Sequence, residues 1–335
     1  MNQYYYFTNK GHHGMPELTD LRDIKSLGKS LFFVLDSCMC LELIKLADHK
    51  KKAKISHKLL FNFLDLVKRS KARLFPLGGL VELCTDHDSK EIDSEKFYDF
   101  FHKIKMIEIL PIKHIRNFNY DYANYLTAAD FKIPSRLNGF DDMLLPTYCC
   151  LLKLRELALI NSTRKDCMEK NLIAYLEWME NILEIIMGVE FRLGTKIFGG
   201  DTEFRRMIHL DGKPSEVKKK IMGTAWDICH YRLFSSPENL SVVVGEDTFP
   251  VFVTKDLPFF KLVRSIFSAP VNSGTRIMID NYDSSFESYE IINEINERMI
   301  KIAENRAQRE IRYDEKKIKK LIYELEKINL IHASF

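Results

Sequence analysis

Four acidic side chains lie at the end of an apolar segment or inside one. They are Asp36, Glu82, Asp227 and Asp256. Carboxylates gathered in one pocket repel one another, so a fold that gathers four usually neutralises them with a metal ion. Oxygen ligands are the type that Mg²⁺ and Mn²⁺ prefer. If the four residues converge, they predict a divalent-metal site with the chemistry to activate a bound water.

Each of these residues also has an ordinary structural interpretation. Asp36 and Asp256 follow apolar runs, which is a position typical of helix N-caps. Asp227 has capping-box spacing from Thr224, and Glu82 fits the solvent face of an amphipathic helix. A helical interaction protein whose acids are caps and surface charges would leave the four scattered in space. Convergence is therefore the property that separates a site from four unrelated residues.

The segments that must position these acids alternate between predicted strands and predicted helices. The run Leu31–Leu35 is continuously apolar and stops at Asp36, which is typical of a strand buried on both faces of a parallel sheet. A carboxylate there lies at the carboxyl edge of the sheet, where open α/β folds place their sites. Strands are predicted at 31–35, 72–76, 249–254 and 276–279, and helices at about 38–47, 57–69, 78–86, 94–105, 215–234 and 257–267.

Two further stretches are predicted to be helical. Apolar residues recur at helical spacing in 144–159 and 170–188, and no convincing strand is found in 106–214. The highly charged tail at about 286–330 carries a short heptad-like seam. We expect this seam to dock on the parent domain, with self-association (a homo-oligomer) or a partner helix as the alternative. The seam residues are Ile311, Ile318, Leu321, Leu325 and Ile328.

In their order along the chain and in their local sequences, the four acidic segments resemble the PIN-like domain family of metal-dependent nucleases. The likeness is carried by Phe33–Ser37, Leu80–Leu83, Ala225–Ile228 and Val253–Phe259, the last with the pattern strand-Thr-x-Asp-x-x-Phe. It covers about 31–105 and 215–280. The chain departs from a compact member of the family in the much longer segment between Glu82 and Asp227, and in the bulky Trp226.

The resemblance implies an α/β fold with a PIN-like three-layer core around a central, mostly parallel sheet. The core would be split between 31–105 and 215–280. The remaining segments would be an N-terminal extension (1–30), a large α-helical insertion (106–214) and a C-terminal helical region (281–335).

The resemblance also implies an enzyme: a metal-dependent endoribonuclease that hydrolyses phosphodiester bonds in single-stranded or structured RNA, or less often a DNA nuclease. Asp36, Glu82, Asp227 and Asp256 would hold Mg²⁺ or Mn²⁺, and the ion would activate the attacking water. Thr254 would orient Asp256 or a metal-bound water, or would simply pair in its strand. A role as a toxin or defence effector is one expectation. A non-catalytic PIN-like scaffold that binds RNA or protein is the alternative.

The charge balance implies that any nucleic-acid surface is local. The chain has 50 basic and 47 acidic residues, for a net charge of +3. Two basic runs could contact phosphates or could simply be solvated. They are Lys50, Lys51, Lys52 and Lys54, and then Lys68, Arg69, Lys71 and Arg73. The run Tyr4, Tyr5 and Tyr6 could stack on bases, although a hydrophobic anchor for the N-terminus is the favoured interpretation.

The histidines offer weaker candidates. His12 and His13 resemble a metal pair, but adjacent side chains point apart on regular structure. His230 lies one helical turn after Asp227 and therefore on the same face. It could touch phosphate, or it could be a partly buried structural residue.

Other features exclude several classes of protein. No apolar run reaches the roughly 18 residues that a membrane span needs, and the first residues do not form a secretion signal. The seven cysteines are an odd set without CxxC pairs, so we expect buried thiols in a reducing cytoplasm. No GxxxxGK(S/T), strand-linked GxGxxG, HExxH or GxSxG motif is present. Their absence removes the commonest NTPase, dinucleotide-binding, zincin and hydrolase interpretations.

Overall fold

The chain forms two compact units. The computed structural model describes residues 4–8, 16–48, 57–86, 91–120, 141–234, 236–270, 276–280, 289–309 and 314–332. The first unit comprises 1–137 and 230–260, and the second comprises 138–229 and 261–335.

The first unit contains a sheet and the helices around it. Its elements in chain order are β1 (Tyr5–Phe7), α1 (Leu18–Ser26), β2 (Ser30–Leu35), α2 (Ser37–Ala47), α3 (His57–Ser70), β3 (Arg73–Phe75), α4 (Leu77–Cys84), α5 (Ser94–Ile109), α6 (Ile112–Arg116), the end of α10 (Val217–Phe234), α11 (Pro237–Val244), β4 (Thr248–Thr254) and the start of α12 (Leu257–Arg264). The elements predicted around Asp36, Glu82 and Asp256 are present, with ends that differ by a few residues. The α/β class is therefore confirmed.

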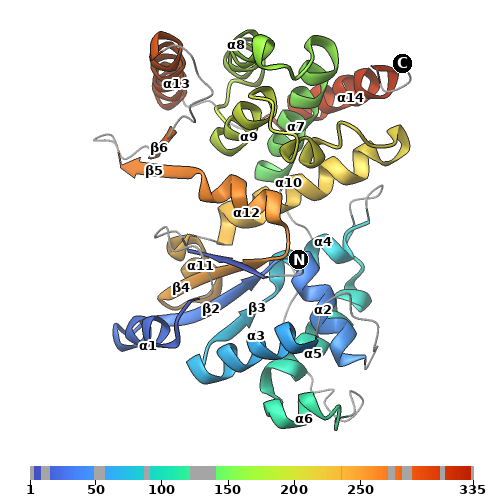
Figure 1. Cartoon of the computed structure of the whole chain (residues 1–335), viewed down its shortest axis with the longest axis vertical. Helices are drawn as coiled ribbons and strands as arrows, with labels where there is room; N and C mark the ends of the chain where they lie inside the picture. The colour runs from blue at the N-terminus through green and yellow to red at the C-terminus, as the bar shows by residue number, and fades with distance from the viewer. Residues whose placement is uncertain are drawn as a thin grey trace. The chain divides into compact units, whose positions relative to one another are not determined.

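The sheet is small and mostly parallel. Its four strands lie in the order β1-β4-β2-β3 (Figure 1). The central β2 is parallel to both neighbours, with Ser30 opposite Thr248 in β4 and Phe32 opposite Arg73 in β3. At the other edge, β1 runs antiparallel to β4. The chain goes from β2 to β3 on one side and later to β4 on the other. The strand order thus reverses between β2 and β4, and open α/β sheets bind ligands at such a switch point.

Apolar side chains on both faces make β2 and β4 interior strands. Successive side chains of a strand point to opposite faces. Phe33 of β2 packs edge to face on Phe63 of α3, with ring centroids 5.5 Å apart. Phe33 is paired with Val251, so the next residue, Phe252, faces the other side, where it stacks on Phe7 of β1 at 4.9 Å. Every residue of β4 is buried, as a continuous apolar run predicts.

The N-terminal tyrosines anchor the edge strand. Tyr4 and Tyr6 are buried, and Tyr6 packs edge to face on Phe33. Tyr5 stacks on Phe260 at 4.8 Å. These contacts confirm the hydrophobic-anchor interpretation over stacking on bases. The segment 1–30 is therefore more than an extension, because it supplies a strand of the sheet.

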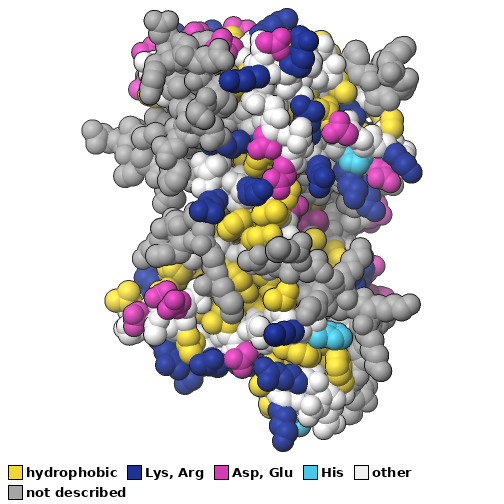
Figure 2. All heavy atoms as spheres, viewed as in Figure 1, with side chains coloured by type: hydrophobic (Ala, Val, Ile, Leu, Met, Phe, Trp, Pro, Cys, Tyr) yellow, Lys and Arg dark blue, Asp and Glu magenta, His cyan; other side chains and the backbone are white. Residues whose placement is uncertain are grey.

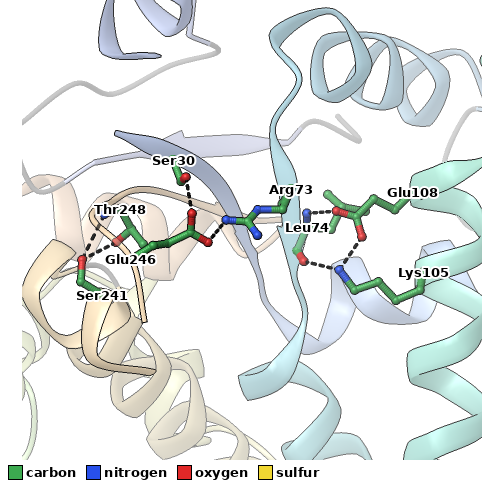
Figure 3. A network of polar contacts seen from close by, with 8 residues as sticks. All are labelled: Ser30, Arg73, Leu74, Lys105, Glu108, Ser241, Glu246 and Thr248. Atoms are coloured by element: carbon green, nitrogen blue, oxygen red, sulfur yellow. Dashed lines mark hydrogen bonds and ion pairs between the residues drawn. The ribbon is translucent and has the colours of Figure 1, made fainter. Parts of the chain in front are cut away.

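A polar network holds the amino-terminal ends of the parallel strands (Figure 3). Glu246, just before β4, accepts a hydrogen bond from the Ser30 hydroxyl at 2.6 Å and forms an ion pair with Arg73. The Arg73 guanidinium also lies 4.3 Å from the centroid of the Phe32 ring. These contacts tie the starts of β2, β3 and β4 together, at the end of the sheet opposite to Asp36.

Side chains of α5 cover the outer edge of β3 (Figure 3). Glu108 accepts a hydrogen bond from the backbone N–H of Leu74 at 2.8 Å, and Lys105 donates to the Leu74 carbonyl at 3.4 Å. Lys105 and Glu108 also pair with each other. An exposed strand edge is a template for another chain. These two side chains occupy the groups that such a chain would use.

The second unit is mainly helical. Its elements are α7 (Asp141–Asn161), α8 (Met168–Trp178), α9 (Gly188–Phe198), most of α10, the end of α12, β5 (Ile266–Pro270), β6 (Arg276–Asp280), α13 (Tyr289–Arg309) and α14 (Glu315–His332). The last helix, α14, packs along α7 (Figure 1). Arg155, buried in α7, donates to the backbone and side-chain oxygens of Asn329 at 3.1 Å each. Ile318 and Leu325 are buried, so α14 docks on its own chain, whereas Ile311 lies outside the described residues.

The two units divide the chain differently from the predicted domains. The strand predicted at 276–279 is present as β6, but it pairs with β5 in a separate antiparallel hairpin of the second unit. The tail 281–335 belongs to the same unit as most of the insertion. Residues 106–120, expected in the insertion, complete α5 and form α6 in the first unit. The pattern of residues along the chain does not show which unit an element joins, because tertiary contacts decide which elements pack together.

Two expectations from composition can be compared with this fold. None of the helices in the described ranges is long and apolar enough to cross a bilayer. Five cysteines are buried as expected: Cys40, Cys84, Cys149, Cys150 and Cys229. Cys38 is exposed and Cys167 is partly exposed. Burial raises the pKa of the Cys84 thiol to about 12, which keeps it protonated and unreactive.

Candidate acidic site

Asp36 lies at the carboxyl end of the central strand and caps the next helix. One carboxylate oxygen accepts the backbone N–H of Met39, in the first turn of α2, at 2.7 Å. The other oxygen accepts the hydroxyl of Thr254 at 2.6 Å. The residue is only 2% exposed. Asp36 is therefore an N-cap and a buried strand-end carboxylate at once.

Thr254 and Asp256 come from the neighbouring parallel strand. The Thr254 hydroxyl, which donates to Asp36, also accepts the backbone N–H of Asp256 at 3.0 Å. The Asp256 carboxylate accepts the backbone N–H of Phe259 at 2.7 Å, so Asp256 caps α12. Thr254 thus orients the carboxylate of Asp36, rather than that of Asp256 as expected from the sequence. Thr254 also pairs with Tyr5 in the sheet, which is the alternative role expected for it. Its orientation of a metal-bound water stays a prediction.

Two adjacent glycines bring Glu82 to the same edge of the sheet. Gly79 of α4 packs so closely on the turn after β2 that a Cβ atom there would lie 2.7 Å from the carbonyl carbon of Asp36. Gly78 is comparably crowded by side chains of α10. Only glycine permits so close an approach of one backbone to another. One turn later on α4, Glu82 hydrogen-bonds the side chain of Ser37.

Burial and mutual repulsion disfavour the ionised forms of these acids. Burial raises the pKa of Asp36 to about 6 in spite of three hydrogen bonds to its carboxylate, and the charge of Asp256 contributes. Burial likewise raises the pKa of Glu82 to about 8, and the charge of Asp36 contributes. Three of the four acids thus meet at one edge of the sheet, close enough for each charge to act on the next. An unrelated set of caps and surface charges predicts a scattered arrangement instead.

His230 is a buried, neutral side chain beside Glu82. Its Nδ1 atom lies 3.9 Å from Glu82 Oε2, an oxygen with no hydrogen-bond partner among the described residues. Burial lowers the pKa of His230 to about 3, so the two groups do not form an ion pair near pH 7. This favours the structural interpretation of His230 over a contact with phosphate. The pair His12 and His13 lies outside the described residues.

Asp227 lies in the middle of α10 and belongs to the second unit. Its capping-box interpretation is wrong, because α10 extends for several residues on both sides of Thr224. The Thr224 hydroxyl donates instead to the backbone carbonyl of Met207 at 2.8 Å. That Asp227 joins the three acids of the first unit stays a prediction.

The acids of the first unit are ligands of the type that a divalent cation prefers, but among the described residues too few of them lie together to hold one. Their donors are carboxylate oxygens, which hard cations prefer, and Glu82 offers a buried oxygen without a hydrogen-bond partner in the described ranges. Among those same residues, however, no group of three or more His, Cys, Asp and Glu side chains could hold a metal ion. Binding of Mg²⁺ or Mn²⁺ by Asp36, Glu82, Asp227 and Asp256 therefore stays a prediction.

Sequence reasoning missed one buried acid at this edge of the sheet. Glu42, on α2, is 2% exposed and accepts a hydrogen bond from Lys255 Nζ at 3.1 Å. Lys255 stands between Thr254 and Asp256. The signal was present, since Glu42 lies in the apolar stretch 38–47 just as Glu82 lies in its own. A charged side chain in an apolar stretch is costly to bury unless another group pairs with it or hydrogen-bonds to it.

The basic runs give little support to a broad phosphate-binding surface. The run Lys50–Lys54 lies outside the described residues. In the second run, Arg73 pairs with Glu246, and Lys68 donates to two backbone carbonyls of the α5 C-terminus. On the face drawn in Figure 2, basic and acidic side chains are interspersed. That face therefore shows no broad basic patch among the described side chains.

The fold and the site define an α/β protein, mostly helical, with three acids at the switch point of a small mixed sheet. Comparisons with protein-family models, with curated proteins and with solved structures find no match. The resemblance to the PIN-like family consequently depends on the four acidic motifs.

Proposed function

We propose that the chain is a divalent-metal-dependent nuclease of the PIN-like type that hydrolyses phosphodiester bonds, with RNA as its expected substrate. One observation carries the proposal: Asp36 and Asp256 follow the adjacent parallel strands β2 and β4 at their carboxyl ends, and Gly79 lets Glu82 approach them. Ligands of open α/β sheets bind at this position. The raised pKa values of Asp36 and Glu82 support it, because perturbed acids cluster at functional sites.

The chain's own residues would hold Asp36 ready for this chemistry. A divalent cation, when bound, supplies a water of lowered pKa and neutralises charge on the phosphate. Thr254 and the Met39 N–H each donate to a different oxygen of Asp36, so the carboxylate is oriented before a ligand arrives. Glu82, with its pKa near 8, would lose its proton when a cation binds. Cation binding should therefore strengthen as the pH rises toward 8.

The test is cleavage of end-labelled single-stranded RNA by the full chain in Mn²⁺ or Mg²⁺, with single-stranded DNA of the same sequence alongside. The wild type should cut, EDTA should stop it, and Asp36→Asn and Glu82→Gln should each slow it by at least about tenfold. The matched control is Glu95→Gln, an exposed carboxylate on α5, which should cut like the wild type. Asp227→Asn in the same assay decides whether the second unit contributes an acid. Equal cutting by wild type and Asp36→Asn, or no cutting by the wild type with either metal, would contradict the proposal.

A second candidate is a non-catalytic PIN-like scaffold that binds RNA or protein. Two observations favour it: Asp36 and Asp256 already act as helix N-caps, and the described residues contain no group of three potential metal ligands. A scaffold would bind labelled RNA in EDTA but leave it uncut in Mn²⁺. Its Asp36→Asn variant would keep the N-cap, because the amide oxygen can still accept the Met39 N–H, and it would show no cleavage rate to change.

A further inference from the structure

Glu42 and two lysines form a charged cluster beside Asp36. Glu42 Oε1 lies 3.1 Å from Nζ of Lys255 and 3.9 Å from Nζ of Lys45. The Glu42 side chain is 3% exposed, whereas the lysine side chains are 21% and 31% exposed. One buried carboxylate therefore pairs with two lysines whose side chains are partly exposed. The cluster of two lysines and one glutamate has a formal charge of +1.

Lys255 connects this cluster directly to the acidic edge of the sheet. Its backbone N–H donates to the Asp36 carboxylate. The preceding residue, Thr254, donates its hydroxyl to the same carboxylate, and the following residue is Asp256. The ion pair between Glu42 and Lys255 thus ties α2 to the turn between β4 and α12. The Lys255 backbone is thus fixed at the Asp36 carboxylate, and its ammonium group is fixed at Glu42.

The ion pair is poorly arranged for stability alone. Glu42 Oε2 is buried and has no hydrogen-bond partner in the part of the chain that the structure describes. The Tyr4 hydroxyl is also buried without a hydrogen-bond partner among the described residues. Burial raises the pKa of this phenol, and the negative charge of Glu42 raises it further. Desolvation of a buried ion pair is offset only when its remaining polar atoms are also satisfied. A requirement to hold the Lys255 ammonium group in one position would account for this arrangement.

We propose that Lys255 binds a phosphate of the nucleic acid beside the acidic site. Glu42 is the positioning residue that restrains the Lys255 side chain. This inference rests on the nuclease function proposed above and names a residue that contacts its substrate. A phosphodiester is an anion that has to approach three carboxylates, so a fixed cation at that edge offsets the repulsion. Glu42 restrains Lys255, and Lys45 keeps the net charge of the cluster positive.

The experiment measures binding of fluorescein-labelled single-stranded RNA to the full chain in EDTA, by anisotropy, over a series of salt concentrations. One phosphate contact on a single strand contributes about 0.7 to the slope of log Kd against log salt. Lys255→Met should therefore weaken binding several-fold and reduce this slope by about 0.7. Lys58→Met, at an exposed lysine of α3, is the control and should change neither quantity.

Two more variants separate a binding role from a folding role. Lys255→Met leaves the buried Glu42 with the more distant Lys45 as its ion-pair partner, which can destabilise the fold. The double variant Glu42→Gln/Lys255→Met removes both charges, so it should fold and show the same loss of slope. Glu42→Gln alone should bind RNA at least as tightly, because the cluster gains a positive charge, but kcat in Mn²⁺ should fall. A purely structural ion pair would not separate kcat from binding in this way.

The outcomes distinguish this inference from the function on which it rests. If Lys255→Met and the double variant both keep the wild-type slope, the phosphate contact is refuted while the nuclease function stands. If the wild-type chain binds no RNA in EDTA at any salt concentration, the phosphate contact is refuted, and the cleavage assay above decides the nuclease function separately. A slope that falls in both variants and stays unchanged in Lys58→Met supports the contact.

Discussion

Replacing Glu82 by glutamine should make the chain more stable, and increasingly so as the pH rises. Glu82 has an ordinary pKa of 4.5, and burial, with a smaller contribution from the charge of Asp36, raises this pKa to about 8 in the folded chain. Below pH 4.5 the carboxyl is protonated in both the folded and the unfolded chain. Between pH 4.5 and 8 only the folded chain keeps the proton, so unfolding releases it and stability falls as the pH rises.

The size of the effect follows from the pKa difference. Each pH unit in this window lowers the free energy of unfolding by about 1.4 kcal/mol, to a total of at most about 5 kcal/mol above pH 8. This total is an upper limit, because the Glu82 side chain is 17% exposed and water screens part of the charge. Glutamine keeps the shape and can still accept the hydrogen bond from Ser37, but it has no charge to bury.

The assay is urea unfolding of the wild type and Glu82→Gln at pH 5, 7 and 8.5. The variant should gain little at pH 5, and its advantage should grow by up to about 4 kcal/mol by pH 8.5. Glu95→Gln should follow the wild-type curve, because Glu95 is exposed. Mn²⁺ at pH 8.5 should restore stability to the wild type more than to Glu82→Gln if this carboxylate is a ligand.

Parallel pH curves for the wild type and Glu82→Gln would refute the reasoning. They would mean that Glu82 titrates as an ordinary surface glutamate and is therefore not buried beside Asp36. The pH dependence of the wild type alone would not decide the matter, since other groups titrate in the same range. The difference between the two proteins isolates Glu82.

Three further substitutions test the framework of the site. Gly79→Ala would place a Cβ atom 2.7 Å from the backbone of Asp36, so urea unfolding should show a loss of about 1–3 kcal/mol, whereas the control Gly223→Ala, in open space within α10, should gain up to about 1 kcal/mol. Thr254→Val removes the hydroxyl that donates to Asp36, so it should cost about 1–3 kcal/mol at pH 8, where the carboxylate is ionised, and less at pH 5. Glu108→Ala uncovers the outer edge of β3, so light scattering should detect association at concentrations where the wild type stays monodisperse.

Much of the first unit was predictable because its signals are local. The apolar run 31–35 ended at Asp36, and β2 ends there in the structure. Helical periodicity located α2, α3, α5 and α10 to within a few residues, since the pattern along a helix reflects its own buried face. By contrast β1 has three residues and no pattern of its own, so only its pairing with β4 reveals it.

The sequence by itself determined the α/β class, the strand-end positions of Asp36 and Asp256 and the helical position of Glu82, because apolar runs and periodicity depend on neighbours in the chain. Tertiary structure alone decided which groups meet. Thr254 reaches Asp36 across 218 residues and Lys255 reaches Glu42 across 213. The pairing of β6 with β5, and the approach of α4 allowed by Gly79, are likewise contacts between separate elements. No local pattern encodes such contacts, because their free energy exists only once both partners are packed in place.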